Sequence, residues 1–345
     1  MHRICSSLSK AGFRVTLIGR KLKQSLPLSD KGFEQKRLTC LFNRGFAFYA
    51  EYNLRLFFCL LSLKMDGLCA IDLDTILPCF LVSKLQRVVR IYDAHEFFTE
   101  LKEVRSRPVV QKVWTAIERL TVPNFEHGYT VSEGLAAEFR KRYGRDYIVV
   151  RNLPVLTPLK DLPKNEKLLV YQGAVNEGRG FESIIPAMKR INYKLIVCGD
   201  GNFMEQLKIL IRQYNVQHKV EVKGMLLPQQ LKEIAASATL GIGLTEKEGI
   251  NQLHALPNKF LEYIHAGLPQ IAMNFPEYRR INDEFRVALL LNNLDADAIA
   301  DAVNSSMEND LLLQELRNNA LRAREIYCWQ NEEKKLISFY QQIFC

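Results

Sequence analysis

Short apolar runs alternate with helix-length amphipathic stretches along most of the chain. Each run has the length of a buried strand, and a helix between two strands returns the chain to the same edge of a sheet, so the strands are parallel. The predicted strands are 13–18, 67–71, 88–92, 127–131 and 147–150 in the first part, and 168–172, 194–198, 220–222, 240–244, 270–272 and 287–291 in the second. The pattern predicts an α/β protein with two doubly wound, Rossmann-like domains.

A Pro-rich stretch with weak periodicity separates the two halves of this pattern. We interpret residues 155–165 as a linker. The predicted domains are then 1–154 and 166–325, and 326–345 form a last helix that we expect to pack back on the first domain. Two such domains facing each other would bind a ligand between the carboxyl ends of their strands.

The first residues are an unusual start for such a domain. Ile4, Leu8 and Ala11 share one face of a helix that Gly12 ends, and a strand follows at once. A doubly wound domain normally opens with a strand that lies inside its sheet and with a Gly-rich turn. We therefore expect the first strand to be missing, the edges of its two neighbours to be exposed, and the natural reading frame to begin about 10–20 residues upstream.

Composition excludes several classes of protein. The chain has 345 residues, of which 48% are hydrophobic, so each domain can build its own core, and disordered and fibrous proteins are excluded. No apolar run approaches the roughly 18 residues of a membrane span. The eight cysteines form no C-x-x-C pair and no signal peptide is visible, so we expect reduced thiols and a cytoplasmic location.

The positive charge lies in the first part. The formal net charge is +9, and residues 1–154 hold 25 Lys and Arg against 15 Asp and Glu, whereas 155–345 hold 22 against 23. This favours an anionic partner for the first domain, either nucleic acid, a membrane surface or a phosphorylated substrate; a solvated basic face is the alternative. Nucleic acid is not predicted, because no binding module is present and the basic residues are dispersed. The aromatic stretch 46–61 is either a helix that contacts a membrane or lipid, or one buried against the sheet.

The strongest local motif is a short helix late in the chain. Pro257 suits its first position, and Gly267 with the following Pro269 ends it. Lys259 and Glu262 are three residues apart and share a face. A lysine in a first helical turn opposes the helix dipole unless a phosphate is held there, and Glu262 could then accept two ribose hydroxyls. A solvent-facing ion pair between the two is the alternative.

A second motif is the Gly-rich turn at 173–181, after a predicted strand. Gly173, Gly178 and Gly180 let the backbone approach a ligand closely. Arg179 stands at the start of the next helix, where it could bind a diphosphate. A purely structural strand-to-helix turn is the alternative.

These motifs, with Gly199-Asp200-Gly201 after a strand and the stretches 91–96, 129–133 and 150–154, resemble GT-B glycosyltransferases, in particular retaining glycosyltransferase family 4 of group 1. The resemblance extends over nearly the whole chain, from the first helix to 327–329. It implies an acceptor-side first domain and a second domain that binds a nucleoside diphosphate sugar. Its acceptor would be a hydroxyl of a glycan or of a lipid-linked sugar.

The resemblance assigns roles to single residues. The donor residues are Gly173, Arg179, Gly180, Met225, Glu246, His254, Asn258, Lys259 and Glu262. Arg179 and Lys259 would hold the diphosphate and Glu262 the ribose, with the base near Gly224 and Met225. His95 would be catalytic and face the transferred sugar, although a core histidine satisfied by backbone groups is the alternative. Asp72 and Asp93 would lie on the acceptor side.

Two positions depart from the family's pattern. Ala174 stands where the family usually has a phosphate-binding arginine, so one cation is lost. His254 stands near the place of a usual glutamate, for which Glu246 or Glu248 could substitute. The D-x-D sequence at 72–74 follows a strand and precedes an apolar helix, so we interpret Asp74 as a helix N-terminal residue and expect no metal or other cofactor.

The activity that the resemblance implies is a metal-independent, retaining transfer of a hexosyl or N-acetylhexosaminyl group. We expect it to serve surface polysaccharide biosynthesis, with a peripheral position at the inner face of a membrane as one prediction from the basic first part. Two alternatives stay open. One is a sugar-nucleotide 2-epimerase of the same fold, and the other is a non-catalytic protein that binds a sugar nucleotide.

Overall fold

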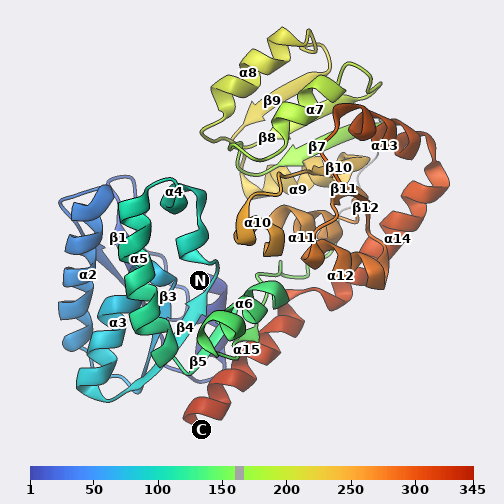
Figure 1. The fold of residues 1–345 in the computed structure, drawn as a ribbon. Helices are drawn as coiled ribbons and strands as arrows, with labels where there is room; N and C mark the ends of the chain where they lie inside the picture. The colour runs from blue at the N-terminus through green and yellow to red at the C-terminus, as the bar shows by residue number, and fades with distance from the viewer. Residues whose placement is uncertain (160–166) are drawn as a thin grey trace. The chain divides into compact units, whose positions relative to one another are not determined.

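Every strand pair in residues 1–159 and 167–345, the part of the chain that the computed structural model describes, is parallel. The strands belong to two units (Figure 1). Unit 1 comprises Met1–Arg151 and Asn331–Cys345, and unit 2 comprises Asn152–Gln330. The division thus falls at Arg151, where the sequence predicts a boundary at 154. Of the predicted linker 155–165, residues 160–165 lie outside the described part.

Unit 2 contains a six-stranded sheet in the order β12-β11-β10-β7-β8-β9. Its strands are β7 (Leu168–Gln172), β8 (Lys194–Cys198), β9 (Val220–Gly224), β10 (Leu240–Gly243), β11 (Gln270–Met273) and β12 (Ala288–Leu291). All six were predicted, with ends that differ by at most two residues. The chain leaves the central strand β7 toward β8 on one side and returns as β10 on the other. This reversal creates the crevice at the carboxyl ends of β7 and β10 where doubly wound proteins bind ligands.

Helices enclose both faces of the unit 2 sheet (Figure 1). They are α7 (Phe181–Ala187), α8 (Met204–Gln213), α9 (Pro228–Ser237), α10 (Gly249–His254), α11 (Asn258–His265), α12 (Pro276–Phe285), α13 (Ala296–Glu308) and α14 (Asp310–Ile326). Alternate residues of β7 belong to separate cores: Leu169 and Tyr171 pack in one, and Val170 packs in the other with Tyr263 of α11. Successive strand residues point to opposite faces, so a strand that is covered on both faces is apolar throughout. The continuous apolar run of β7 in the sequence was the basis for predicting this strand.

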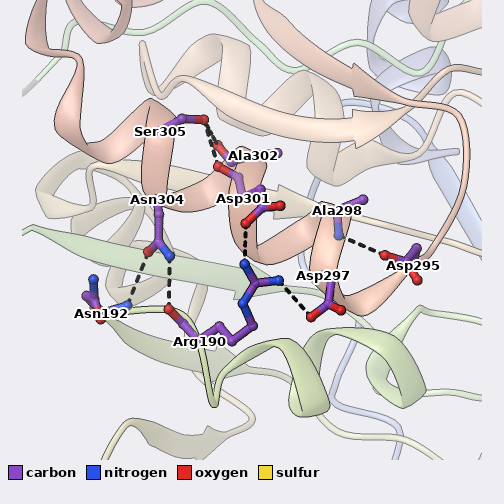
Figure 2. Close-up of polar contacts among 9 residues, drawn as sticks. All are labelled: Arg190, Asn192, Asp295, Asp297, Ala298, Asp301, Ala302, Asn304 and Ser305. Carbon is purple, nitrogen blue, oxygen red and sulfur yellow. Dashed lines mark hydrogen bonds and ion pairs between the residues drawn. The ribbon is translucent and has the colours of Figure 1, made fainter.

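A charged network fastens α13 to the turn that follows α7 (Figure 2). The Arg190 guanidinium contacts Asp297 at 2.7 Å and Asp301 at 2.6 Å. Asn304 continues the contact, since its side chain donates to the carbonyl of Arg190 and accepts from the backbone N–H of Asn192. These groups are exposed, so the ion pairs hold α13 in position against the turn but add little to the free energy of unfolding.

Unit 1 contains two separate sheets. β1 (Thr16–Lys21) pairs with β2 (Glu34–Thr39), and the other sheet has the order β3-β4-β5-β6, with β3 (Gly67–Ile71), β4 (Val89–Ala94), β5 (His127–Thr130) and β6 (Ile148–Val149). The sequence did not predict β2, whose residues are mostly polar. The first strand also begins later than predicted, because Phe13 packs on Tyr340 and Phe344 of the last helix instead of entering the sheet.

The predicted interruption of the first sheet is present. β1 pairs only with β2 and β3 only with β4 among the described strands, so each has an unpaired edge. A cavity of about 810 Å³ is lined by residues from both sides, including Val15 and Leu17 near β1 and Leu68 and Ile71 of β3. Tyr340 contributes to its wall. The backbone of this part of unit 1 is therefore held by helices rather than by a continuous hydrogen-bonded ladder.

The helices of unit 1 are α1 (His2–Lys10), α2 (Gly45–Leu61), α3 (Leu73–Gln86), α4 (Lys102–Arg105), α5 (Pro108–Thr121), α6 (Glu133–Tyr143) and most of α15 (Trp329–Phe344). The last helix packs on β5, with the rings of Phe339 and Tyr340 5.8 and 6.4 Å from that of Tyr129. The aromatic stretch forms α2, of which one face is buried and the other exposed. Within the described residues, no helix has the length and apolar character needed to cross a bilayer.

We expect Gly199→Ala to destabilise unit 2 by roughly 3 kcal/mol or more. Its φ is +144°, and an added Cβ would lie 1.8 Å from the carbonyl oxygen of Gly173, so the turns after β7 and β8 would have to separate. Gly224→Ala is the matched control, since its φ is also positive but no atom lies within 4 Å of the added Cβ. Urea unfolding of both variants checks this, and equal losses would contradict it.

Candidate functional site

The Gly-rich turn after β7 is held by its neighbours in unit 2. The N–H of Gly173 donates to Cys198 at 3.0 Å, and that of Val175 donates to Asp200 at 3.0 Å. On the other side, the carbonyl of Gly178 accepts from the Thr245 hydroxyl and the Glu246 N–H, both at 2.9 Å. The turns after β7, β8 and β10 are therefore locked together, and the predicted residue Glu246 is brought to the turn that the sequence singled out.

Arg179 lies at the end of this turn and directly before α7. Gly180 is the N-cap of α7, with φ +74°, and an added Cβ would come 3.1 Å from the Cβ of Leu244. Only a residue without a side chain fits comfortably in this conformation and space. The predicted glycine is thus required by the local geometry. The positive charge of the preceding Arg179 acts against that of Lys259.

Lys259 occupies the first turn of α11, which begins at Asn258 rather than at the predicted Pro257. The residue is only 8% exposed, and its ammonium lies 4.0 Å from the centre of the Tyr171 ring. Nζ has no hydrogen-bond partner among the described residues. The predicted alternative, a solvent-facing ion pair with Glu262, is therefore wrong, because the lysine points into the unit while Glu262 is exposed.

The environment of Lys259 disfavours its charge. Burial, with a further contribution from the charge of Arg179, lowers its pKa from 10.5 to about 7. No carboxylate in the described part of the chain forms an ion pair with either cation. Two unpaired cations at a helix N-terminus and beside a Gly-rich turn form a site for a strongly charged anion.

Glu262 faces the other way on α11. Its Oε2 accepts from the Gln172 side chain at 2.5 Å, and Gln172 is the last residue of β7. The hydroxyl of Tyr263 accepts from the Gln172 N–H at 3.0 Å and donates to the Val170 carbonyl at 3.1 Å, which fastens α11 to β7. Sequence analysis missed Gln172, although a polar residue that ends a buried strand was a signal for it.

The other predicted donor residues have separate environments. The Oδ1 of Asn258 accepts from Asn152 at 3.0 Å. His254 ends α10, and its buried Nδ1 has no partner among the described residues. Met225 follows β9, where Gly224 accepts a hydrogen bond from Gly199, and its side chain is exposed. The structure gives no contact that joins His254 or Met225 to Lys259, so their roles stay predictions.

In unit 1, His95 follows β4 and is surrounded by acidic groups. Its N–H donates to Asp72 at 2.8 Å, and its Nε2 lies 3.2 Å from Asp93 Oδ1. The second oxygen of Asp93 accepts from the Tyr129 hydroxyl at 3.1 Å. The predicted alternative of a ring satisfied by backbone groups is therefore wrong, since the ring partner is a carboxylate.

The pKa values in this cluster depend on one another. Burial by itself lowers the pKa of His95, but the hydrogen bond and charge of Asp93 and the charge of Asp72 outweigh it and raise the pKa to about 9. Burial raises the pKa of Asp72 to about 7, against the opposing effect of His95. The imidazole is thus a charged donor at neutral pH, with its side chain 31% exposed.

Asp72 and Asp93 differ in what they can contact. Asp93 is 1% exposed; its Oδ2 accepts from the Tyr129 hydroxyl, and its Oδ1 forms the ion pair with His95. Asp72 is the N-cap of α3 with φ +54°, a strained conformation for a residue other than glycine. Its N–H donates to the Asp93 carbonyl at 2.9 Å. The acceptor-side roles of both residues stay predictions.

In the described part of the chain, no three His, Cys, Asp or Glu side chains are grouped as metal ligands.

Comparison with solved structures identifies the fold. Sucrose-phosphate synthase from Thermosynechococcus elongatus is 16% identical with a TM-score of 0.84, over 99% of this chain and 92% of that one. WaaG, described as a glycosyltransferase involved in lipopolysaccharide biosynthesis, is 16% identical with a TM-score of 0.73, over 98% and 94%. HepE from Anabaena, in complex with UDP-glucose, is 13% identical with a TM-score of 0.73, over 90% and 87%. The fold is that of the GT-B glycosyltransferases, which confirms the predicted class.

The family match lies mainly in unit 2. Residues 158–323 match the family described as glycosyl transferases group 1. The chain is also 26% identical over 184 residues to the uncharacterized glycosyltransferase MJ1607 of Methanocaldococcus jannaschii. That match covers 51% of this chain and 45% of the relative, slightly less than half its length. The predicted resemblance to group 1 is confirmed, whereas family 4 stays a prediction.

We expect Asp93→Asn to lower the pKa of His95 by roughly 1–3 pH units, because the ring loses its carboxylate partner. Tyr129→Phe removes only the hydroxyl that orients Asp93, so it should change the pKa less. NMR titration of the His95 ring measures both effects. An unchanged His95 pKa in Asp93→Asn would show that Asp72 alone supports the charge.

Proposed function

We propose that the chain is a retaining glycosyltransferase that moves a hexosyl or N-acetylhexosaminyl group from a nucleoside diphosphate sugar to an acceptor hydroxyl. The observation that carries this proposal is the enclosed Lys259 ammonium, which lies beside Arg179 without a counter-ion. A diphosphate supplies the missing negative charge. The match of residues 158–323 to group 1 supports this choice of anion over others.

The same cations serve the chemistry. When the glycosidic bond to the diphosphate breaks, negative charge accumulates on the leaving phosphate oxygens. Arg179, Lys259 and the N–H groups at the start of α11 would stabilise this charge. We infer that no metal is required, since the protein supplies the positive charge.

The nucleoside would extend from the diphosphate along α11. Glu262 is exposed one turn after Lys259, and its second oxygen is free to accept from ribose hydroxyls while Gln172 holds the first. The base would lie near Gly224 and Met225. The complexes of HepE with UDP and with UDP-glucose favour uridine nucleotides as the first donors to test.

His95 has a more limited role than the resemblance implies. A protonated imidazole donates hydrogen bonds, and it would repel the positive charge that develops on the transferred sugar. We therefore assign the His95 ring to holding a sugar hydroxyl, with Asp93 as its positioning partner. No protein nucleophile is assigned. In the inferred route the acceptor attacks on the face that the diphosphate leaves, and a phosphate oxygen takes its proton.

The acceptor is proposed to be a glycan or a lipid-linked sugar in surface polysaccharide biosynthesis. The involvement of WaaG in lipopolysaccharide biosynthesis supports this class of acceptor. A thermal-shift screen of nucleoside diphosphate sugars would identify the donor, because a ligand at a hundred times its Kd adds about 2.7 kcal/mol. Donor turnover without acceptor would favour a 2-epimerase, and binding without any turnover would favour a non-catalytic protein.

We expect Lys259→Ala and Glu262→Ala each to weaken donor binding ten- to hundredfold, since a charge-assisted contact is worth roughly 1.5–3 kcal/mol. Lys259→Ala should weaken inorganic pyrophosphate as strongly as UDP-glucose. Glu262→Ala should weaken UDP-glucose but not pyrophosphate, because pyrophosphate has no ribose. Calorimetry with both ligands separates the two roles, and normal donor binding by both variants would refute the site.

We expect the affinity for UDP-glucose to fall as the pH rises above about 7, by up to tenfold per pH unit. Free Lys259 loses its proton in this range, whereas the complex needs the charged form, so binding takes up a proton. The diphosphate of UDP-glucose keeps its charge over this pH range, so a pH dependence of the affinity comes from a group of the protein. Lys259→Met should bind weakly at every pH, without this slope. A slope retained in Lys259→Met would assign the proton to another group.

A further inference from the structure

Two strands of unit 1 present an unpaired edge to the same cavity. Among the described strands, β1 pairs only with β2 and β3 only with β4. Both β1 and β3 contribute residues to the wall of the cavity of about 810 Å³. We call the part of this cavity beside the two edges the strand slot, and we define it by Thr16 and Ile18 on β1 and Gly67 and Cys69 on β3.

The backbone of β1 directs hydrogen-bonding groups toward the strand slot. The N–H of Glu34 on β2 donates to the carbonyl of Val15 at 2.9 Å, which fixes the parity of this parallel ladder. Alternate residues of a strand direct their N–H and C=O groups to the same side, so those of Thr16 and Ile18 point away from β2. Neither residue has another backbone partner in the part of the chain that the structure describes.

The edge of β3 has the same property. The N–H of Val89 on β4 donates to the carbonyl of Asp66 at 3.2 Å, so residue 68 also bonds to β4. The N–H and C=O groups of Gly67 and Cys69 therefore point away from β4. No described backbone group pairs with them. Unpaired donors and acceptors thus line the strand slot on two sides.

The unpaired stretch of β3 ends at Ile71. This residue has the same parity as Cys69, but the Thr75 hydroxyl accepts from its N–H at 3.0 Å and donates to its C=O at 2.6 Å. The side chain of Thr75 thus takes the place of a neighbouring strand at this position. The remaining stretches, 67–69 on β3 and 16–18 on β1, match a strand of about five residues, which is an ordinary strand length.

Apolar side chains cover both faces of the strand slot. On one face, Leu68 packs in a core with Leu56 of α2. On the other, the Phe344 ring of α15 lies against Gly67, where it would collide with an added Cβ. Leu56 and Phe344 both line the cavity. A strand that entered the slot would be covered on both faces, so it would have to be apolar at every position, as β7 is.

We propose that the strand slot binds an extended apolar peptide of another polypeptide as an additional β-strand. A peptide in this conformation pairs with the backbone groups of β1 and β3 at the same time and buries side chains on both faces. A lipid tail would fill the apolar volume but would leave the backbone groups unpaired. The peptide would contact β3, the strand that leads to Asp72, and the proposal does not depend on the donor site in unit 2.

The probe is a fluorescent synthetic peptide of about five alternating Val and Ile residues, flanked by lysines for solubility. Fluorescence anisotropy should show that the wild type binds it. Amide hydrogen exchange, followed by NMR, should slow about tenfold or more at the residues that define the strand slot. The N–H groups of Leu17 and Leu68 bond to β2 and β4 instead, so their exchange should change less.

Backbone methylation of the probe distinguishes the slot from an ordinary sheet edge. Successive residues of a strand bond to opposite neighbours, so N-methylation of either of two adjacent central residues removes a hydrogen bond to one wall. Each methylation should weaken binding about five- to hundredfold, because an acceptor is left unpaired. A peptide that only extended an exposed edge would be sensitive at one of the two positions, and that result would overturn the proposal.

A pair of proline variants tests the protein side. Thr16→Pro removes an N–H that faces the strand slot, at the first residue of β1, where proline is tolerated. Thr39→Pro is the matched control, since it removes an N–H at the end of β2 that faces away from β1. Thr16→Pro should weaken the probe about fivefold or more, and Thr39→Pro should bind it like the wild type. Equal binding by both variants would contradict the proposal.

Melting temperature shows whether each variant is folded, and the methylated probes test the wild-type chain if Thr16→Pro is not. Two further results would overturn the proposal. One is no binding of the probe by the wild type. The other is displacement of the probe by lauric acid together with insensitivity to N-methylation, which would make the cavity a site for a lipid tail. UDP-glucose binding is measured alongside, and its failure would affect the proposed activity without affecting the strand slot.

Discussion

The enclosed ammonium of Lys259 is the constraint on which the proposed donor site depends. A pKa lowered from 10.5 to about 7 means that the charged form is disfavoured by about 5 kcal/mol relative to water. A structural lysine is usually neutralised by a neighbouring carboxylate, but the charge that acts on Lys259 here is the cation Arg179. In the proposed site, a bound anion would offset both the burial of the ammonium and its repulsion by Arg179.

Lys259 stays enclosed because its helix cannot move. Tyr263 ties α11 to the backbone of β7, and Phe260 and Ile264 are fully buried in cores on the helix's inner side. The same helix thus directs a cation inward and Glu262 outward. The turns after β7 and β8 are in close contact, which only glycine at position 199 permits. The position of α11 is therefore set by contacts within unit 2 and does not require a ligand.

In unit 1, burial and opposite charges act together on one group of side chains. Asp72, Asp93 and His95 lie together at the ends of β3 and β4, and the two carboxylates favour the charged form of His95 that burial by itself would disfavour. The surrounding sheet is interrupted, with unpaired edges on β1 and β3. The His95 cluster is nevertheless well supported, because it belongs to the continuous four-stranded sheet and because α15 packs on Tyr129, which holds Asp93.

The sequence by itself determined the parallel strands of unit 2 and two local motifs, the Gly-rich turn after β7 and the short helix with Lys259 and Glu262. These features are visible because apolar periodicity, glycine and proline act locally. It did not reveal β2, because a polar edge strand has no such pattern, nor Gln172, whose role comes from contact with Glu262 90 residues away. Only tertiary structure decided that Lys259 is enclosed, that His95 rests on Asp93, and that α2 divides into a buried and an exposed face. Burial and charge pairing depend on segments that are distant along the chain, and no local pattern records them.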